Sequence, residues 1–273
     1  MVISSTIPCV LRKPELTIVF RDLCRHINYL SPLPNREIAQ VTSSGATSGR
    51  WIGAPESVNR VELGKNDDRL LLSLETIREV DPTDAQSLFN NLAGHLSSYF
   101  NYQVRPFSRR VFHIGWAKTG TTSITEAMRI LGLFSWQFAP WVSSFNHFQT
   151  KAQPITYDFD CIEHYRFLSD LPFSLAYKQL DEAFPGSLFI YTTRDKNSWL
   201  RSAIVEVQKH IETSGCVHGV ESWAYGSDVV DADHFLCRYL EHKEEVLSYF
   251  SGRPDFLSID LTKGNPWQCF ASF

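Results

Sequence analysis

The stretch Val111-Phe-His-Ile-Gly115-Trp-Ala-Lys118-Thr-Gly-Thr-Thr-Ser123 decides the fold of this 273-residue chain. An apolar, strand-like run comes first and a glycine-containing turn follows. An amphipathic helix then begins, because apolar residues recur at helical spacing: Ile124, Ala127, Met128 and Leu131. Such a turn points backbone N–H groups and the positive end of a helix at one place, which suits an anion. The sequence therefore predicts an anion-binding turn, to which Lys118 and the neighbouring hydroxyl groups add further donors.

The spacing of Gly115 and Gly120 matches the phosphate loop of nucleotide triphosphatases, G-x-x-x-x-G-K-[ST]. That motif requires a lysine directly after the second glycine, where this chain has Thr121. Lys118 instead lies inside the turn, so its ammonium group approaches the anion from the loop. A nucleotide phosphotransferase stays an alternative, but it also needs magnesium ligands, and Thr121 speaks against it.

A second basic motif follows a strand predicted over residues 187–193. Arg194 comes directly after Leu188-Phe-Ile-Tyr-Thr-Thr193, and Ser202 stands eight residues later on a predicted helix. A guanidinium group presents a planar fork that binds phosphate through two hydrogen bonds and stays charged at any accessible pH. Arg194 and Ser202 therefore predict a second phosphate site.

The two motifs together resemble those of sulfotransferases that use 3'-phosphoadenosine 5'-phosphosulfate (PAPS). The run from Lys118 to Ser123 is similar to the loop that holds the 5'-phosphosulfate in that family, and Arg194 with Ser202 is similar to its 3'-phosphate site. The resemblance covers residues 109–273. It implies a PAPS-dependent enzyme that moves a sulfuryl group to a hydroxyl or amine of a small-molecule or carbohydrate acceptor.

The resemblance also implies a role for each motif residue. Lys118 is expected to be catalytic, because it would stabilise charge on the bridging and leaving oxygens. The 5'-phosphosulfate is expected to be held by Lys118, Thr119, Gly120, Thr121, Thr122 and Ser123, and the 3'-phosphate by Arg194 and Ser202. PAPS acts as a co-substrate, and no metal ion is expected. Ser123 departs from the family pattern, since many members have an adenine-stacking tryptophan there. A non-catalytic nucleotide- or phosphate-binding scaffold of the same fold remains the nearest alternative.

The general base is the least determined part of the predicted site. We favour Asp170, because this branch of the family has an acidic residue ahead of the arginine strand and burial beside apolar neighbours would raise its pKa. The same Ser-Asp-Leu-Pro sequence also suits a turn or a helix cap. His164 is the second catalytic candidate and Asp158 a further one. His113 is disfavoured, because strand residues before such a loop usually point into the core.

The order of predicted elements indicates an α/β fold, a three-layer parallel sheet flanked by helices. The predicted strands are 111–115, 187–193 and 255–261, and the predicted helices are 121–132, 174–184, 197–212 and 231–250. In such sheets ligands bind at the carboxyl ends of strands, so we expect Lys118 and Arg194 at one edge. Residues 109–273 form the predicted sulfotransferase-like domain. Residues 1–108 form an N-terminal extension of mixed α+β character, with a hairpin of strands 59–63 and 69–74 and helices over 16–30 and 83–99.

Composition narrows the possible partners. A net charge of −4 and a pI near 6.1 argue against nucleic-acid binding through a broad basic surface. Six dispersed cysteines form no C-x-x-C pair, and no apolar run is long enough to span a membrane, so we expect a cytoplasmic enzyme. The sequence is compatible with a homo-oligomer. An aromatic segment is expected to line the acceptor pocket: Phe134, Trp136, Phe138, Trp141, Phe145 and Phe148.

Overall fold

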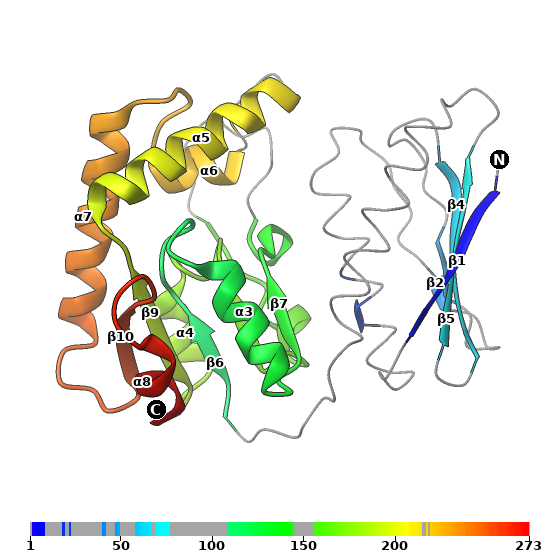
Figure 1. The fold of residues 1–273 in the computed structure, drawn as a ribbon, viewed down its shortest axis with the longest axis horizontal. Coiled ribbons are helices and arrows are strands. Elements are labelled where there is room, and N and C mark those ends of the chain that lie inside the picture. Colours follow the sequence, from blue (N-terminus) through cyan, green and yellow to red (C-terminus); the bar gives the residue numbers. More distant parts are fainter. Residues whose placement is uncertain are drawn as a thin grey trace. The chain divides into compact units, whose positions relative to one another are not determined.

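The computed structural model describes residues 109–144, 155–214, 217 and 219–272, together with 2–8, 18–19, 22, 40–41, 47–49, 58–66 and 69–76. The chain forms two compact units, Met1–Val104 and Arg105–Phe273 (Figure 1). None of the helices in these ranges has the length and apolar character needed to cross a membrane.

The N-terminal unit contains a five-stranded antiparallel sheet in the order β1-β5-β4-β3-β2. Its strands are β1 (Val2–Pro8), β2 (Gln40–Val41), β3 (Thr47–Gly49), β4 (Val58–Asn66) and β5 (Arg69–Thr76). The predicted hairpin is confirmed, because β4 pairs with β5 and Asn66 lies opposite Arg69. Strand β1 was not predicted. Of the two predicted helices, residues 18, 19 and 22 are helical, and residues 83–99 lie outside the described residues.

The C-terminal unit is built on a second sheet, in the order β10-β9-β6-β8-β7, with every neighbouring pair parallel. Its strands are β6 (Val111–His113), β7 (Ser135–Gln137), β8 (Phe167–Ser169), β9 (Leu188–Thr193) and β10 (Phe256–Asp260). The predicted α/β class with a parallel sheet is confirmed. Strands β7 and β8 were missed because three residues are too short to show a strand period.

Helices cover both faces of this sheet (Figure 1). They are α3 (Thr121–Ile130), α4 (Tyr177–Ala183), α5 (Lys196–Ser214), α6 (Gly219–Tyr225), α7 (Ala232–Tyr249) and α8 (Pro266–Ser272), with 3₁₀ turns η1 (Pro140–Val142) and η2 (Asp160–Ile162). Side chains of β9 alternate between the faces. Ile190 joins the cluster formed with Ile124 and Met128 of α3, whereas Phe189 and Tyr191 contact Phe250 and His242 on the α7 side. The result is the predicted three-layer arrangement.

The parallel sheet places several chain segments at one edge. The segment between β6 and α3, residues 114–120, leaves the carboxyl end of β6, and we call it the lysine loop. Gln137 ends β7, Asp170 follows β8, and Arg194 follows β9. Because β6, β8 and β9 are neighbours, these residues lie close together without any long loop between them.

Ion pairs of Arg253 join α4 to the start of β10 in the C-terminal unit. Its guanidinium group contacts both carboxylate oxygens of Asp181, one of them at 2.9 Å, and both of Asp255 at 3.0 and 2.8 Å. It also lies 4.8 Å from the centre of the Phe250 ring. The hydrogen bonds with Arg253 hold the pKa of Asp181 and the pKa of Asp255 below their usual range. These carboxylates therefore stabilise the fold at neutral pH, and that stability is lost as the pH falls through their lowered pKa values.

Replacing Arg253 by lysine is expected to lower the free energy of unfolding by about 1–2 kcal/mol at neutral pH, because an ammonium group cannot bind two carboxylates in this bidentate manner. Urea denaturation at pH 7 and near pH 3 measures the effect, and the difference from the original protein should shrink at the lower pH. Lys263→Ala is the control, since the Lys263–Asp260 pair involves a largely exposed lysine. Equal losses in the two variants at neutral pH would contradict the assignment.

Candidate active site

Three carbonyl groups of the lysine loop accept hydrogen bonds from side chains. The Trp116 carbonyl accepts from the Thr119 hydroxyl at 2.6 Å, the Ala117 carbonyl from Trp199 Nε1 at 2.9 Å, and the Lys118 carbonyl from Arg194 Nη1 at 3.1 Å. The oxygens that would repel an anion are therefore occupied by donors. The first bond of α3 runs from Ile124 N to Gly120 O. Helix geometry leaves the N–H groups at the start of α3 without intrahelical partners, so they are available to an anion.

A buried chain of hydrogen bonds joins the lysine loop to strands β6 and β9. His113 Nε2 lies 2.6 Å from Thr192 Oγ1, which lies 2.6 Å from Thr119 Oγ1. Because the Trp116 carbonyl only accepts, Thr119 uses its single hydroxyl proton there. Thr192 therefore donates to Thr119, and His113 donates its Nε2–H to Thr192. Burial lowers the pKa of His113 to about 3, so the ring is neutral and acts as a structural donor.

Neighbouring atoms leave no room for a side chain at either glycine of the motif. A Cβ atom on Gly115 would lie 2.7 Å from His113 Nε2 and 2.8 Å from Thr192 N, inside the buried chain of hydrogen bonds. Gly120 has a φ of 110°, a conformation that other residues rarely adopt, and a Cβ there would lie 2.7 Å from Leu261 Cδ1. Both glycines are therefore required by the shape of the loop.

Asp170 is joined to the start of α3 through Gln137. Gln137 Nε2 lies 3.1 Å from Asp170 Oδ2, 3.3 Å from Thr121 Oγ1 and 3.2 Å from Thr122 Oγ1. Burial raises the pKa of Asp170, while hydrogen bonds from Gln137, the Leu171 N–H and Thr121, and then the Lys118 charge, act in the opposite direction. A carboxylate whose pKa is raised accepts a proton more readily, which suits a general base.

Arg194 is held firmly at the end of β9. The Tyr239 hydroxyl accepts from the Arg194 N–H at 3.2 Å and donates to the Arg194 carbonyl at 2.9 Å. Tyr239 in turn stacks on Trp199, with ring centroids 4.1 Å apart. Arg194 Nε is buried and has no hydrogen-bond partner among the described residues. A buried cationic donor without a partner fits an anionic ligand group.

Lys118 contacts the face of α5 that carries Ser202. Lys118 Nζ lies 3.2 Å from Glu206 Oε2, and Glu206 stands one helical turn beyond Ser202. Lys118 has a left-handed φ of 68°, which brings its side chain to α5 while its carbonyl remains bonded to Arg194. The structure thus brings together the lysine loop, the start of α3, Asp170 and Arg194, with Ser202 on the adjoining helix.

The structure does not bring His164 into this group, although the sequence offers it as a catalytic candidate. It is exposed and precedes β8, whereas Asp170 follows the same strand. Its neighbour Glu163 accepts from Arg110 Nη2 at 2.6 Å, and Arg110 precedes β6. His164 therefore lies at the amino edge of the sheet, away from the lysine loop. Asp158 is also exposed, and its carboxylate accepts from the Asp160 N–H at 3.2 Å.

Two rings of the aromatic segment after α3 belong to the core. Phe134 stacks on Tyr165 at 4.7 Å, and Trp136 meets Trp141 edge-on at 5.3 Å. Phe134 and Trp136 are both buried. Phe138 and Trp141 are only partly buried, and the expectation that this segment lines an acceptor pocket stays a prediction. Phe145 and Phe148 lie outside the described residues.

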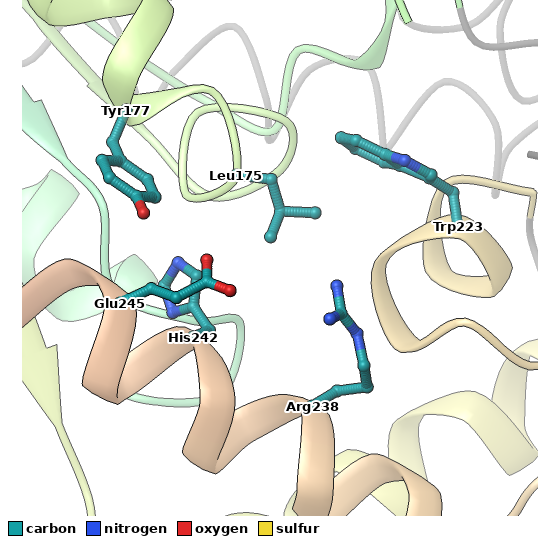
Figure 2. A pocket seen from close by; sticks show the side chains of 6 residues that line it. All are labelled: Leu175, Tyr177, Trp223, Arg238, His242 and Glu245. Atoms are coloured by element: carbon teal, nitrogen blue, oxygen red, sulfur yellow. The ribbon is translucent and has the colours of Figure 1, made fainter. Parts of the chain in front are cut away.

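The C-terminal unit also contains a pocket of about 190 Å³ (Figure 2). It lies among α4, α6 and α7 and is lined by Leu175, Tyr177, Trp223, Arg238, His242 and Glu245. The His242 ring lies 4.6 Å from the ring of Trp116, a residue of the loop. His242 Nε2 donates to the Ser174 carbonyl at 2.7 Å, and burial lowers the pKa of His242 to about 4. The contact between the His242 and Trp116 rings thus connects this pocket to the lysine loop.

Several neighbours of the loop carried no recognisable signal in the sequence. Gln137 ends a strand of three residues, Thr192 lies in an apolar strand, and Tyr239 lies on an amphipathic helix without a motif around it. Glu206 had one usable signal, because it lies four residues after Ser202 on the same helix face. No cluster of three or more His, Cys, Asp or Glu side chains suited to a metal ion occurs among the described residues.

Comparison with known families agrees with the extent of the C-terminal unit. A family model described as "Sulfotransferase domain" matches residues 110–273, which is more than half of the chain. The match contains both the lysine loop and Arg194. No curated protein matches the chain.

Thr192→Val is expected to lower the free energy of unfolding by about 1–3 kcal/mol, because at almost unchanged volume it removes the acceptor of the buried His113 N–H and the donor to the Thr119 oxygen. Thermal and urea denaturation measure the loss. Thr193→Val is the matched control, since Thr193 is the next residue of β9 and is only partly buried. A Thr192 variant as stable as this control would rule out the supporting role of the buried chain.

Proposed function

Because the chain belongs to the family of proteins with a sulfotransferase domain, we propose that it transfers a sulfuryl group from PAPS to a hydroxyl or amine of a small-molecule or carbohydrate acceptor. The family match supports sulfuryl transfer in general. The choice of donor rests on one observation, the 3.1 Å hydrogen bond between Arg194 Nη1 and the Lys118 carbonyl. It joins the two motifs that would hold the two phosphate groups of PAPS.

The residues present fit a donor with two separate anionic ends. The start of α3 offers backbone N–H groups beside Lys118 and the hydroxyls of Thr121 and Thr122, which would bind the 5'-phosphosulfate. Arg194 Nε is buried and has no hydrogen-bond partner within the part of the chain that the structure describes, and Ser202 lies on the helix that follows Arg194. These two side chains would bind the 3'-phosphate. A donor bound in this way would expose its sulfuryl group at the carboxyl edge of the sheet.

The proposed reaction forms one bond to sulfur and breaks another. The acceptor oxygen or nitrogen attacks the sulfur atom, and the bond between sulfur and the bridging oxygen breaks, releasing adenosine 3',5'-bisphosphate. Lys118 stabilises the negative charge that develops on the leaving oxygen, a task that suits a compact ammonium group. Asp170 takes the proton of the acceptor, consistent with its raised pKa and with its link to the start of α3 through Gln137. The chain's contribution is therefore alignment, charge stabilisation and proton removal.

Purified protein is expected to bind adenosine 3',5'-bisphosphate in a calorimetric titration, and to bind it in preference to ATP with magnesium. Arg194→Ala and Lys118→Ala should each weaken binding by about tenfold or more, because each removes a charged hydrogen-bond donor. His164→Gln is the control, since His164 lies at the other edge of the sheet and should leave affinity unchanged. A preference for magnesium ATP, or equal affinity in all four proteins, would overturn the proposal.

Asp170→Asn is expected to lower the rate of sulfuryl transfer by about 10²–10⁴ while bisphosphate affinity changes little, because the amide keeps the shape but cannot accept the proton. Transfer from labelled PAPS to a panel of phenols, amines and sugars measures the rate. The original protein should lose activity as the pH falls through the raised pKa of Asp170. Asp158→Asn serves as the exposed control. Full activity of the Asp170 variant would assign the base elsewhere.

A further inference from the structure

A chain of alternating charges leads away from Lys118 across two helices. Lys118 Nζ lies 3.2 Å from Glu206 Oε2 on α5, and Glu206 Oε1 lies 3.8 Å from His210 Nε2. His210 Nδ1 then lies 2.9 Å from both carboxylate oxygens of Glu221 on α6. The function proposed above uses only the first of these four residues.

One face of α5 carries the middle of this chain. Ser202, Glu206 and His210 follow one another at intervals of four residues, so they project from the same side of the helix. That face meets the lysine loop through Glu206 and α6 through His210. The Glu221 side chain is only 11% exposed, so it requires a hydrogen-bonding partner, and His210 supplies it. The position of His210 is thus fixed from both sides.

We propose that Glu206, His210 and Glu221 are positioning residues of the donor site, and that the positive charge on His210 limits how strongly Glu206 competes with the donor for Lys118. This inference rests on the proposed function, because it assumes that Lys118 binds an anionic donor. With His210 charged, the four side chains together are neutral. With His210 neutral, they carry one net negative charge beside a site for an anion, and Glu206 has Lys118 as its nearest cation.

The surroundings of His210 favour the charged form near neutral pH. Its hydrogen bond with Glu221 raises the pKa of His210, burial lowers it, and Glu206 raises it further, while Lys209 on the same helix opposes them. Tyr225 lies next to Glu221 on α6, and its pKa is raised by burial and by that carboxylate, so it adds no charge. His210 therefore loses its proton above the usual histidine value of 6.5, and donor affinity should fall over that range.

The test is calorimetric titration of the full chain with adenosine 3',5'-bisphosphate between pH 6 and pH 9. The bisphosphate itself ionises near pH 6, so each variant is compared with the original protein at each pH. Relative to His210→Gln, the original protein should lose about threefold to fivefold in affinity as the pH rises. Glu221→Gln should move this fall to lower pH, because it removes the contact that contributes most to the charge on His210. Glu206→Gln should bind more tightly and show no such fall.

His164→Gln is the matched control, because His164 is an exposed histidine at the other edge of the sheet, and it should follow the original protein at every pH. A proton NMR titration of His210 provides a second readout, and Glu221→Gln should lower its pKa. Bisphosphate binding with the same pH dependence in His210→Gln and the original protein would overturn this inference and leave the proposed function intact. No bisphosphate binding at any pH would overturn the proposed function, and this inference with it.

Discussion

The hydrogen bond from the Arg194 guanidinium group to the Lys118 carbonyl is the contact on which the candidate site depends. It joins two segments 76 residues apart in sequence and holds a lysine that has a left-handed backbone. Such a conformation costs roughly 1–2 kcal/mol for a residue other than glycine, so it needs fixed partners. Arg194 supplies one through the carbonyl, and Glu206 supplies another through the ammonium group. The arginine therefore shapes the loop before it meets any ligand.

The parallel sheet makes this contact possible. Strand β6 lies between β8 and β9, so the segments that follow these three strands leave the same edge as neighbours. Thr192 of β9 reaches under the loop that follows β6, and Gln137 of β7 bridges Asp170 to the start of α3. An antiparallel arrangement would send alternate strand ends to opposite edges. The chemistry at this edge is thus a consequence of strand direction and strand order.

The lysine loop, helix α3 and the strand before Arg194 could be predicted because each carries its own periodic or motif signal. Gln137 and Tyr239 could not, since their importance comes from partners brought near by the sheet. The residue type of His164 suited a base, but the sequence did not reveal that His164 precedes β8 and so lies at the other edge of the sheet. The position of His164 could not be predicted because β8 was not recognised, and a strand of three residues is too short to show a period in the sequence.

Two carboxylates approach Lys118 from different elements, and their environments give them different tasks. Asp170 follows a buried strand and is held by Gln137, and burial raises its pKa, so it is suited to exchange a proton. Glu206 stands on the partly exposed face of α5 and pairs directly with the ammonium group at 3.2 Å, so it is suited to balance charge. When the surroundings of two carboxyl groups differ in this way, the two groups can serve different purposes in one site. In the proposed function the two carboxylates therefore have different roles, since Asp170 removes a proton and Glu206 pairs with Lys118 when no donor is bound.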